Sequence, residues 1–255
     1  MASWVASGCR EWRSIVTPPR TVTFDFHDTV AIAPRWFQLE TRALPTAVLA
    51  VLNDTGVVTW DPARDDEVTA AYRAMRATVA ETGIERIALD GTQHALQAVE
   101  IVLPDTTVAP VIDRIMADAV AEARPRPGIQ DTVWMLANLR VPLGVISSAV
   151  YHPFLEWCLE AWGLREHFAT VVTSASCGFY KSHPGIYQYA LDALDVAPQE
   201  AVHVGDSYRY DVQAAHAIGM RTVWLNLKGE ERVDNLADLT VPNLVGLVPK
   251  LWGMA

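Results

Sequence analysis

Three side chains that can bind a metal or transfer a proton lie together near the start of the chain. Residues 21–30 read TVTFDFHDTV, and the valine and phenylalanines of this run predict a buried strand. Asp25, His27 and Asp28 follow within four residues, where the apolar run ends. A carboxylate can act as a nucleophile or bind a hard cation, and an imidazole can give and take a proton near neutral pH. This stretch is therefore a candidate catalytic site.

Polar residues also follow other apolar runs of the chain. If those runs are parallel strands, their carboxyl ends meet at one edge of a sheet, which is where ligands bind in such folds. We therefore expect polar groups from distant parts of the sequence to converge beside Asp25. Ser147 and Asp206 follow such runs directly, Asp211 lies between a predicted strand and a predicted helix, and Lys181 lies just before a predicted helix.

The elements that must position these residues alternate between strands and helices. Short apolar runs predict buried strands, and the segments between them have helical periodicity, which together favour an α/β fold with a parallel sheet. The predicted strands are 22–26, 142–146, 201–204, 222–225 and, more weakly, 169–173. The predicted helices that follow strands are 153–162, 184–194 and 211–218.

A helical segment interrupts this alternation after the first strand. Its apolar residues recur at helical spacing, Pro45 is expected to kink its first helix, and the PRPG sequence at 125–128 predicts a return to the sheet. The predicted helices are 35–53, 64–82, 91–103 and 104–123. We therefore expect an α/β core formed by residues 1–33 and 125–255, with a helical domain inserted at residues 34–124.

Composition narrows the functional classes. The net charge of −10 argues against nucleic-acid binding, and no apolar run is long enough for a transmembrane helix. The first twenty residues lack the apolar core of a signal peptide, so a cytoplasmic location is expected. Three cysteines, Cys9, Cys158 and Cys177, have neither zinc-site spacing nor an even number, which predicts reduced thiols.

The order of these polar residues resembles the haloacid dehalogenase-like (HAD) superfamily. That family has a strand ending in DxDGT or a variant, a strand ending in Ser or Thr, a lysine, and a strand ending in GDSxxxD. The corresponding residues here are DFHDT at 25–29, Ser147, Lys181 and GDSYRYD at 205–211. The resemblance spans about residues 21–225 and implies a Rossmannoid parallel-sheet core with an inserted α-helical cap domain.

The resemblance also implies a reaction and a role for each matched residue. The expected reaction is Mg²⁺-dependent hydrolysis of a small phosphate monoester, in which Asp25 attacks phosphorus and Lys181 neutralises charge. The expected phosphoryl-binding residues are Thr29, Ser147, Ser148 and Lys181. The expected Mg²⁺ ligands are Asp25, the backbone carbonyl of His27, Asp206 and Asp211.

His27 departs from the family pattern. Phosphatases of the family usually carry a second Asp at this position, which protonates the leaving group and later activates water, and Asp28 stands at the family's glycine position. In one interpretation, His27 performs this acid–base work. In a second, a local shift of the loop lets Asp28 take over, since Asp tolerates left-handed backbone. In a third, no residue shuttles the proton, and the chemistry is different, weak or lost.

Two other functions stay open. Dehalogenases of the family use an Asp nucleophile without a metal and expel halide, which needs no proton, but the acidic residues Asp206 and Asp211 do not fit a metal-free site. A catalytically weak protein that binds a phosphorylated ligand is the second alternative. Phosphonate hydrolysis is disfavoured, because it needs a cap lysine and the segment 34–123 contains no lysine.

The inserted domain is expected to choose the substrate. In the family such a cap closes over the site and excludes water. A small phosphorylated molecule is the expected partner, without nucleic acid or membrane, and a homodimer through the cap is a further hypothesis. The cap residues that are candidates for substrate contact are Arg35, Trp36, Arg86, Gln93 and His94.

Overall fold

A parallel β-sheet forms the centre of the protein. The computed structural model describes residues 19–253 and contains a six-stranded sheet in the order β5-β4-β1-β6-β7-β8, with every neighbouring pair parallel. Its strands are β1 (Thr21–Phe24), β4 (Leu143–Ser147), β5 (Phe168–Thr173), β6 (Ala201–Gly205), β7 (Arg221–Leu225) and β8 (Leu239–Val241). The α/β fold class is confirmed. Cys9 lies outside the described residues, whereas Cys158 and Cys177 are free thiols.

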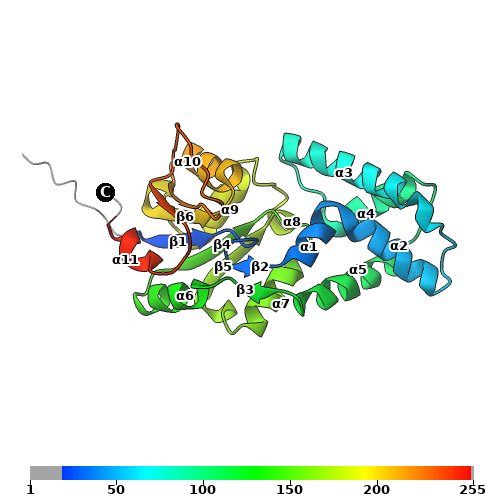
Figure 1. Cartoon of the computed structure of the whole chain (residues 1–255), viewed down its shortest axis with the longest axis horizontal. Helices are drawn as coiled ribbons and strands as arrows, with labels where there is room; N and C mark the ends of the chain where they lie inside the picture. Colours follow the sequence, from blue (N-terminus) through cyan, green and yellow to red (C-terminus); the bar gives the residue numbers. More distant parts are fainter. Residues whose placement is uncertain (1–18, 254–255) are drawn as a thin grey trace, which may run out of the picture.

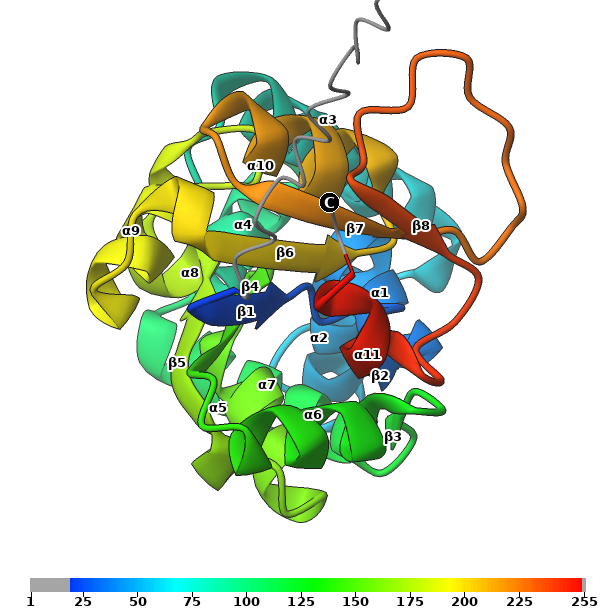
Figure 2. The ribbon, with the colours of Figure 1, turned by 90° about the vertical axis from the view of Figure 1, so that its left-hand side faces the viewer.

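The central strands are buried because helices cover both faces of the sheet. Every residue of β1, β4 and β6 is buried, as their valine-rich sequences predict for a sheet covered on two sides. One face carries α9 (Gly185–Leu194) and α10 (Ala214–Ala217), and the other carries α6 (Ile129–Asn138), α7 (His152–Ala161) and α11 (Leu247–Leu251) (Figures 1 and 2). The remaining short helices of the core are η3 (Arg165–His167), α8 (Ser174–Cys177), η4 (Pro198–Glu200) and the π-helical η5 (Tyr208–Gln213).

The order of the strands creates a switch point beside β1. After β1 the chain forms β4 on one side and continues outward to β5, and then returns to build β6 on the other side of β1. In register, Val22 of β1 lies between Leu143 of β4 and Val202 of β6. Connections therefore diverge at the carboxyl end of β1, which opens a crevice for ligands at that edge.

A helical insert lies between two linkers that leave and re-enter the core. The linkers pair as an antiparallel ribbon of β2 (Ala31–Ile32) and β3 (Arg124–Pro125). The insert extends away from the sheet in Figure 1. Its helices are α1 (Pro34–Gln38), the π-helical η1 (Leu39–Ala43), α2 (Leu44–Asp54), η2 (Pro62–Arg64), α3 (Asp65–Thr82), α4 (Ala88–Gln97) and α5 (Asp105–Val120). The domain boundary at residues 34 and 124 stays a prediction.

Proline and backbone conformation explain where the insert differs from the predicted helices. The first predicted helix is divided, because Pro45 occupies the first turn of α2 and the preceding turn, η1, is π-helical. The third predicted helix begins three residues too late and ends six residues too late, since α4 runs from Ala88 to Gln97. Glu100 beyond it has a φ of 64°, which a helix cannot accommodate.

An aromatic cluster joins the insert to the core. Trp36 of α1 stacks on Phe154 of α7 with ring centroids 4.9 Å apart and an interplanar angle of 2°. Phe26, just after β1, packs edge-on against Trp36 at 5.8 Å and lies parallel to Trp162 at 6.3 Å. The first linker therefore starts from a rigid, apolar base directly beneath the polar strand ends.

Replacing Phe154 by alanine tests the importance of this cluster. Phe154 is fully buried, so Phe154→Ala should lower the free energy of unfolding by about 3–5 kcal/mol through lost burial and a residual cavity. Phe37→Ala is the matched control, since Phe37 is 46% exposed and its loss should cost less than about 1 kcal/mol. Urea unfolding midpoints would measure both changes. Equal losses in the two variants would contradict the proposed role of the cluster.

Candidate active site

A polar cavity opens at the carboxyl ends of β1, β4 and β6. It has a volume of about 620 Å³ and lies between these strand ends and the helical insert. Among its lining residues are Asp25 after β1, Ser147 and Ser148 at the end of β4, and Asp206 after β6. The structure thus brings together polar groups that are far apart in sequence, as the strand pattern predicts.

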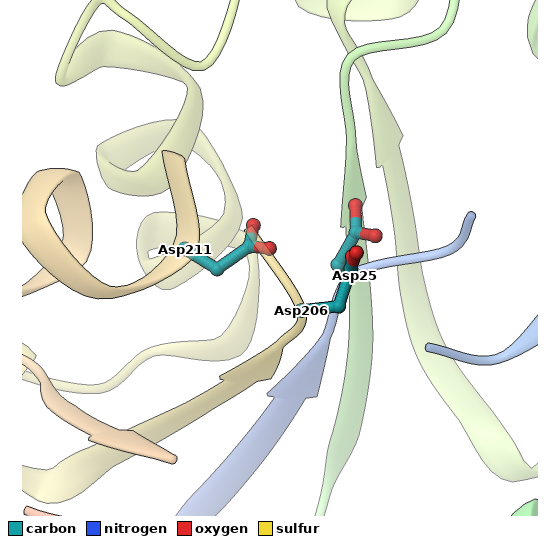
Figure 3. A group of neighbouring side chains, drawn as sticks. All are labelled: Asp25, Asp206 and Asp211. Atoms are coloured by element: carbon teal, nitrogen blue, oxygen red, sulfur yellow. The ribbon is translucent and has the colours of Figure 1, made fainter. Parts of the chain in front are cut away.

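Three carboxylates converge in this cavity. Asp25, Asp206 and Asp211 each offer an oxygen atom, and these atoms lie within 4.8 Å of one another (Figure 3). Burial raises the pKa of Asp25 to about 7, with Lys181 acting in the opposite direction. Burial, helped by the charges of Asp25 and Asp211, raises the pKa of Asp206 to about 8. Ionisation of all three carboxyl groups is therefore unfavourable unless a cation binds beside them.

Lys181 is the cation at the centre of the carboxylate cluster. Its Nζ atom lies 2.5 Å from Asp25 Oδ1 and 2.6 Å from Asp211 Oδ1, and the residue is only 2% exposed. Burial alone would lower the pKa of Lys181, but Asp211 and Asp25 together raise it above the ordinary value. The lysine is therefore charged, and it fixes the position of the Asp25 carboxylate.

Both carboxylate oxygens of Asp211 have polar partners. Its Oδ1 atom accepts from Lys181 and lies 3.3 Å from His203 Nε2, while Oδ2 accepts from the backbone N–H of Ser207 at 2.8 Å. Although burial opposes ionisation, Lys181 and His203 lower the pKa of Asp211 to about 2. Gly205 makes this placement possible, because a Cβ atom there would lie 2.2 Å from Asp211 Cγ.

His203 extends the polar network into the sheet. It lies on β6 and is fully buried, with Nδ1 2.9 Å from Thr23 Oγ1 and Nε2 facing Asp211. The ring also packs edge-on against Tyr187 at 5.3 Å. The sequence pattern did not predict a role for His203. A histidine within an otherwise apolar strand was its only signal, and buried polar groups need partners.

His27 lies at the boundary between the cavity and the first helix of the insert. Its ring stacks on Phe37 with centroids 4.3 Å apart and an interplanar angle of 17°. Burial lowers the pKa of His27, while the nearby Asp28 opposes this shift. His27 and Phe37 also line a neighbouring cavity of about 470 Å³, to which Arg42 and Arg73 contribute.

The three hydroxyl residues predicted to bind phosphoryl oxygens do not share one environment. Ser147 and Ser148 line the cavity, and Ser148 Oγ also accepts from the backbone N–H of Lys181 at 3.1 Å. Thr29 is fully buried, does not line the cavity, and its hydroxyl has no hydrogen-bond partner among the described residues. Thr29 therefore lies outside the cavity lining, and its role in phosphoryl binding stays a prediction.

The insert contributes a different set of residues from the one expected. Of the candidates, Trp36 lines the cavity, but Arg35 pairs with Glu122 at 2.5 Å and Gln93 donates to the backbone oxygen of Leu103 at 2.8 Å. Arg86 and His94 are exposed and do not line the cavity either. The insert residues that do line it are Trp36, Phe37, Glu40, Thr41 and Arg76.

Glu40 and Arg76 are the ionisable side chains that the insert places at the cavity. Glu40 is 4% exposed, and its carboxylate accepts from the backbone N–H of Val150 in the core at 2.9 Å. Arg76 forms an ion pair with the fully buried side chain of Glu85, and its guanidinium lies 5.6 Å from the ring centroid of Tyr180. Burial raises the pKa of Glu40 to about 8.

Backbone hydrogen bonds dock the insert on the core beside the cavity. Ala88 donates its N–H to Val150 at 2.9 Å, and Glu85 donates to Gly178 at 2.9 Å. In the opposite direction, Tyr180 donates to Gly83 at 2.9 Å. The segment between α3 and α4 thus pairs with two core loops, and the insert covers the strand ends.

The raised pKa of Glu40 predicts a pH-dependent stability. Between the ordinary glutamate value of 4.5 and about 8, the folded protein retains a proton that the unfolded chain releases. The contribution of Glu40 is therefore complete below pH 4.5 and is lost as the pH rises towards 8. Its slope is at most about 1.4 kcal/mol per pH unit for one proton.

Glu40→Gln isolates this contribution from those of Asp25 and Asp206, whose pKa values are raised in the same range. Urea unfolding of the wild type and the variant at several pH values should show a shallower decline for the variant. Parallel stability profiles would contradict a protonated Glu40 in the folded protein.

The sequence of this chain is similar to those of known hydrolases. The chain is 34% identical over 131 residues to haloacid dehalogenase-like hydrolase domain-containing protein 3 of Xenopus laevis, an alignment covering 48% of this chain and 53% of that protein. It thus spans about half the length of that relative. It is 30% identical over 213 residues to phosphoglycolate phosphatase of Escherichia coli O157:H7, which covers 81% of each chain.

A solved enzyme structure has a fold similar to that of this chain. A 2-haloacid dehalogenase from Pseudomonas syringae pv. Tomato DC3000 has a TM-score of 0.68 at 23% identity, covering 91% of this chain and 97% of that chain. This likeness concerns the fold. Within residues 19–253, no helix combines the length and apolarity needed to cross a bilayer.

The model of the haloacid dehalogenase-like hydrolase family matches residues 19–219, which include the ends of β1, β4 and β6 at the cavity. The chain therefore belongs to the haloacid dehalogenase-like hydrolases.

Proposed function

We propose that the protein is a Mg²⁺-dependent phosphatase that hydrolyses a small phosphate monoester through a phosphoaspartate at Asp25. The observation that carries this proposal is the contact of Asp25 with Lys181 within a cluster of three carboxylates. The similarity to phosphoglycolate phosphatase supports a phosphorylated substrate of low molecular weight. The cavity of about 620 Å³ is large enough for such a molecule.

The chemistry begins with attack of an Asp25 carboxylate oxygen on phosphorus. A bond forms between that oxygen and phosphorus, and the bond from phosphorus to the ester oxygen breaks. Lys181 orients Asp25 and offers a positive charge to the phosphoryl oxygens, while the hydroxyl groups of Ser147 and Ser148 can donate to those oxygens. Water then attacks the phosphoaspartate and releases inorganic phosphate, which regenerates Asp25.

His27 is the proposed acid–base group. In the first step its imidazole gives a proton to the departing ester oxygen, and in the second it accepts one from the attacking water. Its place at the wall of the cavity, two residues after Asp25, supports this role. Asp28 is less suited to it, because the Asp28 carboxylate is held by Arg126 at 2.5 Å.

The residues of the cluster fit a divalent cation. Mg²⁺ prefers oxygen ligands, and the Asp206 carboxylate has no hydrogen-bond partner among residues 19–253. Burial and the neighbouring carboxylates raise the pKa of Asp206, and a bound cation would favour its ionised form. Asp25, Asp206 and the backbone carbonyl of His27 would hold the ion, with Asp211 beside it. When bound, Mg²⁺ supplies positive charge to the phosphoryl oxygens.

The acidic cluster favours this function over a metal-free dehalogenase. Asp206 contributes a partly buried carboxyl group that halide displacement from carbon does not need. The helical insert, which covers the strand ends, would act as the cap that excludes water.

Removal of the proposed nucleophile should abolish turnover. Asp25→Asn keeps the size of the side chain but removes its nucleophilic carboxylate, so phosphate release from a panel of monoesters should fall by at least about 1,000-fold. Asp118→Asn, an exposed position on α5, is the control and should leave the rate unchanged. Retained turnover in Asp25→Asn would refute the phosphoaspartate route. Halide release that persists in chelator would favour the dehalogenase alternative.

Magnesium binding can be measured without turnover. Titration calorimetry and thermal unfolding should detect Mg²⁺ binding to the wild type, since an ion that binds only the folded state raises its stability. Asp206→Asn should weaken binding by at least about 10-fold, because it removes a charged oxygen ligand. Asp118→Asn again serves as the control. Unchanged Mg²⁺ affinity in Asp206→Asn would show that the cation lies elsewhere.

A further inference from the structure

The two linkers of the helical insert are joined by an ion pair next to the active site. Arg126 follows β3 on the returning linker, and its Nη2 atom lies 2.5 Å from Oδ1 of Asp28 on the outgoing linker. The backbone adds a second connection, because Arg126 donates its N–H to Val30 at 2.9 Å. The Arg126 side chain is 15% exposed and the Asp28 side chain 39% exposed, so the pair is shielded from solvent mainly on the Arg126 side.

The backbone at Asp28 directs its carboxylate towards both Arg126 and His27. Asp28 has a φ of 57°, a left-handed conformation that an aspartate adopts at some cost. Its N–H donates to Ala31 at 2.8 Å, which closes a tight turn between β1 and β2. While Oδ1 binds Arg126, the other oxygen, Oδ2, lies 3.7 Å from Nδ1 of His27. That distance is within ion-pair range, although it exceeds a hydrogen bond.

Stacking alone does not orient the His27 ring. Phe37 lies against one face at 4.3 Å and fixes the plane of the imidazole, but a half-turn of the ring about its Cβ–Cγ bond preserves that plane. The half-turn exchanges Nδ1 with a carbon atom and moves Nε2 to the opposite side. A negative charge near one edge distinguishes these two states, because it attracts the N–H at Nδ1 and not a C–H. Asp28 supplies that charge.

We propose that Arg126 is a positioning residue for acid–base catalysis, acting through Asp28 on the orientation of the His27 ring. The proposal rests on the acid–base role of His27 in the proposed function. Arg126 keeps the Asp28 carboxylate at the Nδ1 edge, and the Nε2 edge is then left for the substrate. Since Asp28 and Arg126 lie on opposite linkers, the orientation of His27 depends on both crossings between core and insert.

The leaving group of the substrate provides a test that a structural role would not affect. A nitrophenolate departs without a proton, whereas an alkoxide needs one, so loss of the acid should slow hydrolysis of alkyl phosphates selectively. The measured quantity is the ratio of kcat/KM for 4-nitrophenyl phosphate to that for glycerol phosphate, with Mg²⁺ present. His27→Asn should raise this ratio by about 100-fold or more, and Arg126→Gln by about 10-fold or more.

Companion variants separate orientation from folding. Asp28→Asn removes the charge but retains a residue that tolerates left-handed backbone, so it should raise the ratio even if Arg126→Gln is unstable. Arg126→Lys keeps a positive charge at this position, so it should raise the ratio less than Arg126→Gln does. Arg35→Gln is the matched control, since Arg35 also lies near the linkers and binds a carboxylate, Glu122, at 2.5 Å but does not contact His27. This control should leave the ratio unchanged.

Nitrogen NMR of the metal-free protein gives a readout without turnover. The ¹⁵N shifts of His27, assigned with the His27→Asn spectrum, report which ring nitrogen carries the proton. They should change in Arg126→Gln and in Asp28→Asn, but not in Arg35→Gln. Unchanged shifts in both variants would overturn the inference, whether or not the wild type releases phosphate.

The outcomes distinguish this inference from the proposed function. No phosphate release by the wild type, or an unaltered ratio in His27→Asn, would refute the proposed acid–base chemistry. If His27→Asn raises the ratio while Arg126→Gln and Asp28→Asn lower both kcat/KM values equally, or change neither, the positioning role alone is wrong.

Discussion

The site depends on one buried contact, in which Lys181 lies between the carboxylates of Asp25 and Asp211. Burying charged groups is costly unless each has a partner, and the lysine serves two of the three aspartates in the cluster. The surrounding architecture maintains this contact: β1 leads into Asp25, η5 carries Asp211, the loop before α9 carries the lysine, and Gly205 leaves space for Asp211. Lys181 contacts the other two aspartates and not Asp206, so we expect a cation to bind beside Asp206.

Most of the core could be predicted from the sequence because its elements are defined locally. Valine-rich runs bounded by polar residues identify buried parallel strands, and Asp25, Ser147 and Asp206 follow them directly. The edge strand β8 was missed because it has only three residues and its pattern of burial is irregular. Helices α6 and α11 were also missed, although their buried apolar residues belong to the main hydrophobic core.

The insert side of the site could not be predicted in the same way. Glu40 and Arg76 have no local motif, since their positions depend on how separate helices pack over the strand ends. Glu40 became recognisable only through its bond to Val150, which is 110 residues away in the sequence. Arg126 likewise gains its partner from the pairing of two linkers 98 residues apart. Such contacts arise from tertiary structure, and propensity carries little information about them.

The backbone amide of Val150 offers a way to observe motion of the insert relative to the core. Val150 donates its N–H to Glu40, and its carbonyl accepts from Ala88, so both backbone polar groups of one core residue are satisfied by the insert. When the insert separates from the core, water must replace both partners at once. The exchange rate of the Val150 amide proton therefore reports the fraction of time that the active site is uncovered, and one backbone resonance serves as an internal gauge of opening.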